Sequence, residues 1–260
     1  SIGCRHVQSI IHQNKYEIHI LEAFSENIKI NLKKIDAKKE EFFWYNKIND
    51  LPKIDIAIVA TSSAPRFEIV KFLIESGCKK MLLEKIVFQS EKQFEIIQLL
   101  AKKNQVKIYC NFVNRYFKPY NDIKKELLKS SDKININIHG GNFGLGCNAI
   151  HYIDMLQYLT NDNIITINSS NIYVSNIKNK RGSMYKEFNG TMKFSNQKSD
   201  SITLISESDY DGDLTISINQ GNKFYFLNED IGKYYIFDDL KCISKDFYPT
   251  PSSKLTNTII

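Results

Sequence analysis

The alternation of apolar and polar positions divides the chain into two parts. Up to residue 112, short apolar runs alternate with longer segments of helical period. The run at 54–60 is nearly continuous, as is typical of a parallel strand buried on both faces. This alternation predicts a doubly wound parallel sheet, in which ligands bind beyond the carboxyl ends of the strands. Further strands are expected at 16–21, 81–83 and 106–112, and helices near 3–11 and at 66–76 and 91–103.

A different pattern begins after Pro119, where a helix is expected at 121–128 and a strand at 134–139. From residue 164 onward, segments of period two dominate, and turn signals such as Asn189-Gly190 separate several of them. They predict a largely antiparallel sheet with one principal helix against it. The expected domains are therefore 1–118 and 119–260. The expected strands are 164–174, 187–194, 202–206, 214–218, 224–227 and 234–237.

The principal helix of the second part follows a glycine-punctuated stretch that begins at His139. Cys147, His151, Asp154 and Tyr158 are spaced at i, i+4, i+7 and i+11, which places all four on one side of this helix. Spacing alone favours the ordinary interpretation, in which satisfied polar groups lie beside a core. The alternative is that the imidazole and the carboxylate face a cleft.

Composition excludes several classes of protein. A hydrophobic fraction of 42% and a charged fraction of 25% are those of an ordinary globular chain. No signal peptide and no apolar run long enough for a membrane span are visible, so we expect a cytoplasmic protein without a membrane partner. The formal charge of +6 comes from lysines spread among 29 acids, which argues against nucleic-acid binding. Five scattered cysteines without a CxxC pair suggest neither disulfides nor a metal site.

The first residues indicate part of a dinucleotide-binding unit. A glycine at a helix start, here Gly3, is followed about 20 residues later by a strand that closes on an acid, Glu22. In this interpretation the helix faces the pyrophosphate and Glu22 accepts hydrogen bonds from the adenosine ribose. An acid after a strand is more often a solvated loop residue, so the signal is weak on its own.

The two ends of the sequence suggest a fragment of a longer enzyme. The rest of the glycine turn and a first strand are expected before Ser1, and the apolar segment 255–260 is expected to be a helix cut short. An exposed apolar groove is then expected where the first strand should lie, and weaker NAD binding than in a chain extended at its amino end.

Three short motifs, taken in order, carry a resemblance. Glu84-Lys85-Ile86 follows a strand, Arg115-Tyr116-Phe117-Lys118-Pro119 lies at the domain junction, and His151-x-x-Asp154 lies on the principal helix. Over nearly its whole length the chain resembles the Gfo/Idh/MocA oxidoreductases, which carry Glu-Lys-Pro, Arg-aromatic-x-x-Pro and His-x-x-Asp at these places. It departs from them at Ile86, where they have proline, and at Cys147, where many have the aspartate of an Asp-His proton relay.

The resemblance implies an α/β Rossmann-like parallel-sheet domain followed by an α+β domain with a mainly antiparallel open sheet. It also implies hydride transfer between a nicotinamide and a secondary alcohol or ketone of a sugar, cyclitol or nucleotide sugar. NAD is expected rather than NADP, because Glu22 would repel a 2′-phosphate. A homo-oligomer formed through the second-domain sheet is expected as well. The residues expected at the cofactor are Gly3, Arg5, His6, Glu22, Thr61, Ser62, Ser63, Glu84, Lys85, Asn111 and Arg115.

The expected catalytic residues are Lys85, His151 and Asp154. Oxidation of an alcohol needs a group that stabilises the developing alkoxide, here Lys85, and a group that moves the proton, here His151. All three are predicted to converge on one cleft between the domains. Without the resemblance, Lys85 is a surface lysine and His151 a core histidine. Two other functions stay open: an imine or enone reductase on the same fold, and a catalytically silent nucleotide-binding or regulatory homologue.

Overall fold

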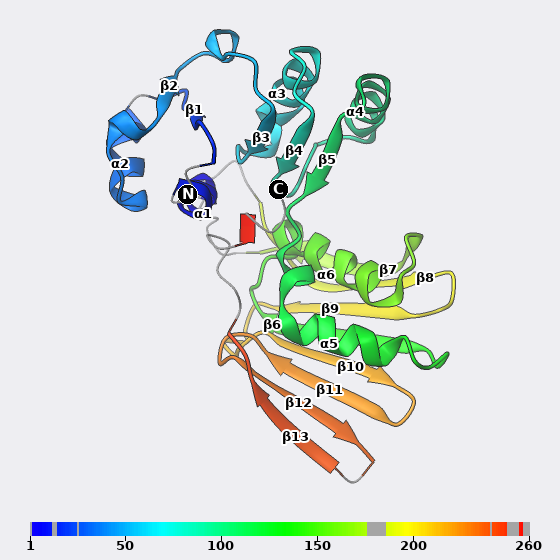
Figure 1. Ribbon diagram of the computed structural model, residues 1–260. Coiled ribbons are helices and arrows are strands. Elements are labelled where there is room, and N and C mark those ends of the chain that lie inside the picture. Colours follow the sequence, from blue (N-terminus) through cyan, green and yellow to red (C-terminus); the bar gives the residue numbers. More distant parts are fainter. Residues whose placement is uncertain are drawn as a thin grey trace. The chain divides into compact units, whose positions relative to one another are not determined.

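The computed structural model describes residues 2–11, 15–24, 26–175, 186–239, 241–248 and 255–256 (Figure 1). These residues form two compact units. The first unit contains the described residues up to Asn111 together with Leu255 and Thr256, and the second contains those from Phe112 to Tyr248. The sequence-based boundary at 118/119 placed Thr256 in the second domain. The structure places it in the first unit, where its hydroxyl lies 2.8 Å from a ring nitrogen of His6.

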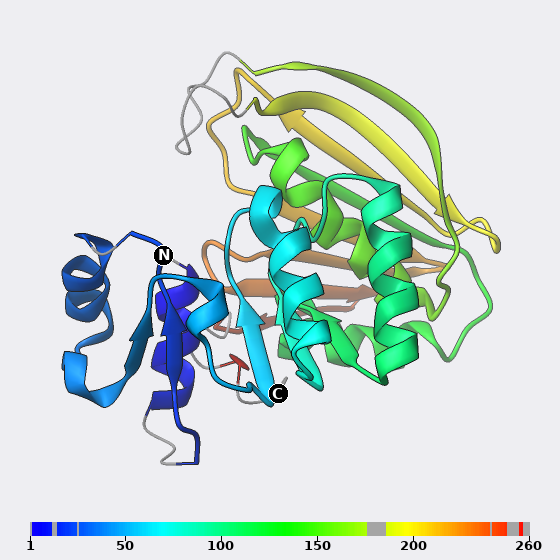
Figure 2. The same cartoon turned by 90° about the horizontal axis from the view of Figure 1, so that it is seen from above.

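The first unit has parallel strands in two separate sheets. Strands β3 (Ile56–Val59), β4 (Lys80–Leu83) and β5 (Lys107–Cys110) form one sheet in the order β3-β4-β5. Strand β1 (His19–Leu21) pairs in parallel with β2 (Phe43–Tyr45) in the other. The helices are α1 (Ile2–Ile10), α2 (Glu26–Ile35), α3 (Ser63–Glu75) and α4 (Glu91–Asn104), with short 3₁₀ turns at Lys39–Glu41 and Ile48–Asp50. Figure 2 shows α3 and α4 side by side.

Burial explains why the three-stranded sheet and the helices α3 and α4 were predictable. Met81, Leu82 and Leu83 of β4 are almost fully buried, as a central parallel strand covered on both faces requires. Gly77 ends α3 in the left-handed conformation, with its own amide and that of Cys78 bonded to carbonyls of the last helical turn. Around β4 a core forms from Val59, Val70, Leu73, Ile74, Cys78, Met81, Leu83, Phe88 and Ile97. A smaller cluster of Cys4, Ile35 and Phe42 lies near the two-stranded sheet.

The second unit is built on one eight-stranded sheet. The strands run β13-β12-β11-β10-β6-β9-β8-β7, and each neighbouring pair is antiparallel except β6 and β9. Helices α5 (Lys118–Leu127) and α6 (Leu145–Thr160) cover one face (Figure 1), where the sequence predicted a helix at 121–128 and the principal helix. The strands are β6 (Ile134–Gly141), β7 (Ile165–Val174), β8 (Phe188–Asn196), β9 (Ser201–Glu207), β10 (Thr215–Gln220), β11 (Lys223–Asn228), β12 (Lys233–Asp238) and β13 (Lys241–Asp246).

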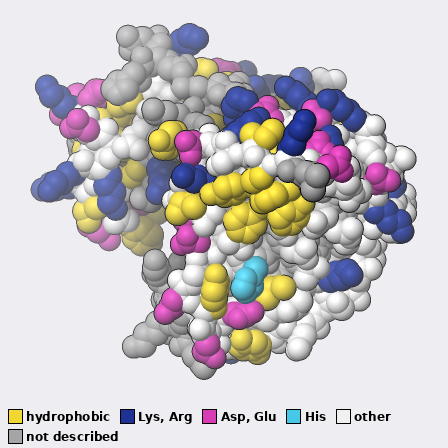
Figure 3. Space-filling view, turned by 90° about the horizontal axis from the view of Figure 1, so that it is seen from below, with side chains coloured by type: hydrophobic (Ala, Val, Ile, Leu, Met, Phe, Trp, Pro, Cys, Tyr) yellow, Lys and Arg dark blue, Asp and Glu magenta, His cyan; other side chains and the backbone are white. Residues whose placement is uncertain are grey.

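The central strands alternate between a buried and an exposed face. Ile136 and Ile138 of β6 and Ile216 and Ile218 of β10 are buried beneath the helices, and their neighbours along each strand face outward. On the outward face an aromatic patch forms from Phe224, Phe226, Tyr235 and Phe237. Its rings lie 5.5 and 6.3 Å apart across β11 and β12. Figure 3 shows hydrophobic side chains gathered on the surface seen from below, with charged ones around them.

Candidate functional site

Most of the first-unit residues expected at the cofactor lie at one edge of the three-stranded sheet. Thr61, Ser62 and Ser63 follow β3, Glu84 and Lys85 follow β4, and Asn111 follows β5. Because the three strands are parallel, their carboxyl ends meet at the same edge. The peptide bond between Lys85 and Ile86 is cis. The Gfo/Idh/MocA oxidoreductases, which the sequence resembles, have Lys-Pro at this position. The fold therefore brings together these six residues, which come from segments that are far apart in the sequence.

Glu84 is the centre of a buried polar cluster. Its Oε1 accepts a hydrogen bond from Nδ2 of Asn111 at 2.6 Å and lies 3.0 Å from Nε2 of His6. Because an ionised carboxylate only accepts, Nε2 of His6 carries its proton, and in the neutral ring Nδ1 accepts from the Thr256 hydroxyl. Glu84 is 8% exposed and His6 3%. Burial acts to raise the pKa of Glu84, but the hydrogen bonds from His6 and Asn111, together with the electrostatic attraction of His6 and Lys85, outweigh it and hold that pKa below its ordinary value.

Arg66, on the first turn of α3, was not singled out by the sequence argument. Its guanidinium donates to the backbone carbonyls of Thr61, Glu84 and Ile86, and also to that of Val87 at 3.3 Å. The side chain is 1% exposed. Burial lowers its pKa, and the charge of Glu84 partly offsets that effect. A signal did exist in the sequence, because Arg66 lies on the same helix face as buried Val70 and Leu73, where a charged residue is unusual.

The remaining first-unit candidates lie on α1 and after β1. Gly3 lies in the first turn of α1, Arg5 is exposed, and His6 points into the Glu84 cluster. Glu22 follows β1, as expected, and its two carboxylate oxygens accept from the amide of Phe24 and from Nδ2 of Asn31, each at 3.2 Å. A carboxylate oxygen accepts more than one hydrogen bond, so these contacts leave Glu22 able to bind a ribose hydroxyl.

In the second unit, Asp154 of α6 is bound by Arg115. Nε and Nη2 of Arg115 donate to the two oxygens of Asp154, at 2.8 and 2.5 Å. Asp154 is 3% exposed, and burial raises its pKa although the bonds from Arg115 act to lower it. Arg115, expected at the cofactor, is thus an ion-pair partner of a predicted catalytic residue.

The predicted face of α6 is present in the structure. Cys147, His151 and Tyr158 are partly buried along the helix, and Asp154 lies between them. The His151 ring lies edge-on to Phe112, with centroids 5.9 Å apart, and the Tyr158 hydroxyl donates to Oδ1 of Asn121 at 2.5 Å. Lys85 belongs to the first unit and His151 to the second. Their convergence on one cleft stays a prediction.

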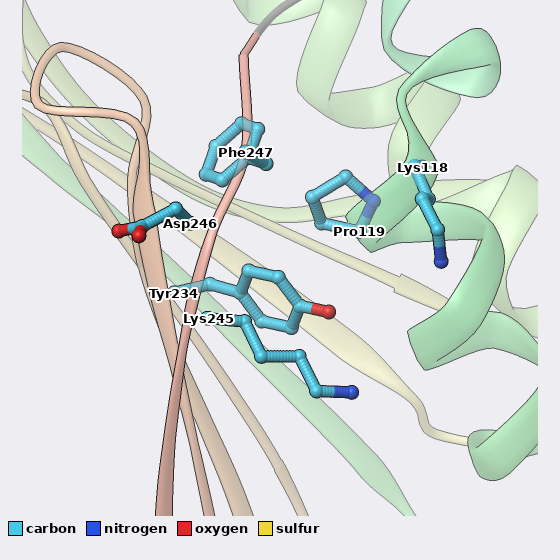
Figure 4. Close-up of a pocket in the computed structure, with 6 residues that line it drawn as sticks. All are labelled: Lys118, Pro119, Tyr234, Lys245, Asp246 and Phe247. Carbon is cyan, nitrogen blue, oxygen red and sulfur yellow. The ribbon is translucent and has the colours of Figure 1, made fainter.

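A pocket of about 300 Å³ lies elsewhere in the second unit. Figure 4 shows its lining, which comprises Lys118, Pro119, Tyr234, Lys245, Asp246 and Phe247. None of the predicted catalytic residues is among them. Within the described ranges no group of three or more His, Cys, Asp or Glu side chains could hold a metal ion. No helix in those ranges is long and apolar enough to cross a membrane.

No protein-family model and no curated protein matches the sequence. Solved structures do match the fold. The dehydrogenase MviM from Clostridium difficile superposes over 100% of this chain and 85% of its own, with a TM-score of 0.76 at 18% identity. The 3-ketoreductase KijD10 from Actinomadura kijaniata, solved with NADP, covers 100% of this chain and 84% of its own, with a TM-score of 0.75 at 10% identity.

A third structure, a super-repressor mutant of Gal80p from Saccharomyces cerevisiae, covers 98% of this chain and 78% of its own. Its TM-score is 0.72 at 16% identity. A dehydrogenase, a reductase and a repressor therefore share this architecture. At these identities the likeness concerns the fold, and it confirms the architecture that the three sequence motifs implied. The chain has the two-domain fold of the Gfo/Idh/MocA-type oxidoreductases.

Proposed function

We propose that the protein is a nicotinamide-dependent oxidoreductase. It transfers a hydride between NAD and a secondary alcohol or ketone of a sugar, cyclitol or nucleotide sugar. The observation that carries the proposal is the meeting of Thr61, Ser62, Ser63, Glu84, Lys85 and Asn111 at the carboxyl ends of three parallel strands. This is where ligands bind in such sheets.

The residues of the first unit fit a dinucleotide. Thr61 and Ser62 are exposed hydroxyls at the strand edge, and Glu22 has acceptor capacity left for a ribose. The amino end of α1, with Gly3 in its first turn, is suited to a phosphate because its amide groups are not used within the helix. When bound, the nicotinamide supplies the hydride acceptor or donor. We assign NAD because the carboxylate of Glu22 repels a 2′-phosphate.

The chain itself handles the proton and the charge on oxygen. In the oxidative direction, the ammonium of Lys85 stabilises the alkoxide that develops on the substrate, and Nε2 or Nδ1 of His151 takes the hydroxyl proton. Asp154 is bound to Arg115, so its role is to fix the Arg115 side chain and the helix that carries His151. Cys147 replaces the acid of the usual relay, and His151 therefore works without that partner.

The test is nucleotide binding followed by turnover. Titration with NADH and NADPH, followed by ligand fluorescence, is expected to show tighter binding of NADH. Glu22→Ser should narrow that difference, because it removes the charge that repels the 2′-phosphate. A panel of sugars, cyclitols and nucleotide sugars, followed by absorbance of the reduced nicotinamide, should then yield at least one substrate. Binding of neither nucleotide would contradict the proposal.

Two alternatives give different results in the same assays. A catalytically silent homologue, which the shared fold with Gal80p and the cysteine at 147 favour, binds nucleotide but turns over none of the panel. An imine or enone reductase oxidises NADH only when imines or enones are added. We also propose that two copies of the chain associate through the aromatic patch of the second-unit sheet.

A further inference from the structure

Arg66 is buried in a way that a merely structural residue does not require. It occupies the apolar face of α3, so an aliphatic side chain there would continue the core formed by Val70 and Leu73. Removing a guanidinium from water is costly unless it is fully hydrogen-bonded. Its Nε is buried without a partner, and every hydrogen bond that Arg66 makes within the described part of the chain goes to a backbone carbonyl. Burying the Arg66 guanidinium therefore costs free energy of folding, which a contribution to stability alone does not explain.

The four carbonyl groups belong to two segments of the candidate site. Nη2 bonds to Thr61, in the loop that leads to Ser62 and Ser63. Nη1 bonds to Glu84 on one side of Lys85 and to Ile86 and Val87 on the other. A planar guanidinium holds its donors in a fixed fork, so the two segments are fixed relative to each other through one rigid group.

We propose that Arg66 is the positioning residue of this site, and that it fixes the backbone of Lys85 and of the Thr61 loop in one arrangement. This inference rests on the proposed function for its catalytic consequence. Lysine cannot replace it, because a single ammonium group on a flexible stem cannot reproduce the fork. Catalysis is sensitive to displacements of this kind, since misplacement of a reacting group by about 1 Å can cost about a hundredfold in rate.

Three variants test the inference. Arg66→Lys keeps the charge and loses the fork, and Arg66→Ala leaves space for added guanidinium ion. Glu68→Ala is the matched control, because Glu68 is an exposed residue on the same helix. Amide hydrogen exchange, which needs no substrate, is measured at residues 61–63 and 84–88 and at the helix α4.

For Arg66→Lys we expect exchange to be faster by at least about tenfold in both segments and unchanged in α4, with kcat reduced by about tenfold or more and KM changed less. Guanidinium ion should restore part of the rate of Arg66→Ala, and Glu68→Ala should behave like the wild type. If Arg66→Ala does not fold, Arg66→Lys alone decides.

Unchanged exchange in both segments of Arg66→Lys would overturn the proposal. So would faster exchange spread evenly over the first unit, which is the result expected of a purely structural residue. A protein that neither binds nucleotide nor turns over any substrate, yet shows the local change in exchange, would refute the proposed function and leave the positioning role in place.

Discussion

Each unit holds one buried carboxylate beside a proposed catalytic residue, and the two carboxylates are satisfied in opposite ways. Glu84 precedes Lys85 and is bound by the amide group of Asn111 and the imidazole of His6. Asp154 lies one helical turn after His151 and is bound by the full positive charge of Arg115. The pKa of Glu84 is nevertheless lowered, and that of Asp154 is raised by burial.

The difference shows that a formal ion pair does not by itself lower the pKa of a buried carboxylate. Desolvation penalises both groups, and the balance depends on how well the remaining hydrogen bonds offset it. In Glu84 two donors converge on one oxygen. Arg115 is 41% exposed, so water weakens the attraction that its charge exerts on Asp154.

The largest effect is expected at Lys85. Lys85→Ala should lower turnover by about 10²- to 10⁴-fold and leave NAD affinity nearly unchanged, because the interaction with the substrate oxygen grows in the transition state. Steady-state rates on a substrate found by the panel, with nucleotide titration, measure both. Lys79→Ala is the control, since Lys79 is exposed just before β4. Undiminished turnover would show that Lys85 is a structural lysine, and Glu84 would then no longer lie beside a catalytic residue.

The second effect concerns Arg115. Arg115→Met leaves the carboxylate of Asp154 buried without its cation, and we expect a loss of about 2 kcal/mol in the free energy of unfolding at pH 7. The loss should shrink as the pH falls, because the raised pKa lets Asp154 take up a proton in the folded state. Urea unfolding at pH 7 and pH 5 measures it. A loss of the same size at both pH values would show that the side chain matters for packing and not for charge.

The third effect concerns Glu84. As with Arg115→Met, the loss of unfolding free energy is expected to shrink as the pH falls. The folded-state pKa of Glu84 is lowered, so its ionised form contributes stability above the ordinary pKa of a glutamate, and this contribution disappears as the pH falls through the folded value. Glu84→Gln should therefore cost about 1 kcal/mol at pH 7 and nothing in acid. The measurement is the difference in unfolding free energy between variant and wild type across pH 3 to 7. A difference independent of pH contradicts the role given to His6 and Asn111.

The smallest change in stability is expected far from both carboxylates. Phe237→Ser in the aromatic patch should change the free energy of unfolding of the single chain by less than about 0.5 kcal/mol, because the ring is partly exposed. It should nevertheless convert a dimer to a monomer in light scattering after size-exclusion chromatography. Ile243→Ser is the control, because Ile243 is exposed on the opposite face of the sheet. A wild-type monomer would end the proposal of association through this patch.

Sequence patterns predicted the buried elements well and missed several exposed ones, although the largely exposed strand β7 was predicted. The run at 54–60 marked β3 because strands covered on both faces are continuously apolar. Strand β13 was missed, since its six residues are all exposed and carry no alternation. Helix α2 was missed as well, because only Ile35 of its ten residues is buried.

The part of the candidate site that could be predicted consists of residues that directly follow parallel strands. The residues after β3, β4 and β5 had to meet, because parallel strands share an edge. The hydrogen bonds around Glu84 were not predictable, since His6 lies 78 positions from Glu84 and Thr256, which bonds to His6, lies 250 positions from His6. Arg66 escaped notice because arginine on a helix usually faces water. Its acceptors are backbone carbonyls, and because every residue has one, the sequence does not indicate which of them bind Arg66.

The single parallel pair in the second-unit sheet has a consequence for how the chain is made. Strand β6 lies at the centre, yet its partners β9 and β10 come much later in the sequence, with Ile138 opposite Leu204 on one side and Ile216 on the other. During synthesis β6 leaves the ribosome long before either partner strand is made. Its apolar side chains and unpaired backbone groups therefore stay exposed until β9 and β10 follow. Folding of this unit is then limited by long-range strand pairing, which is slow, and its nascent chain is a natural client for chaperones.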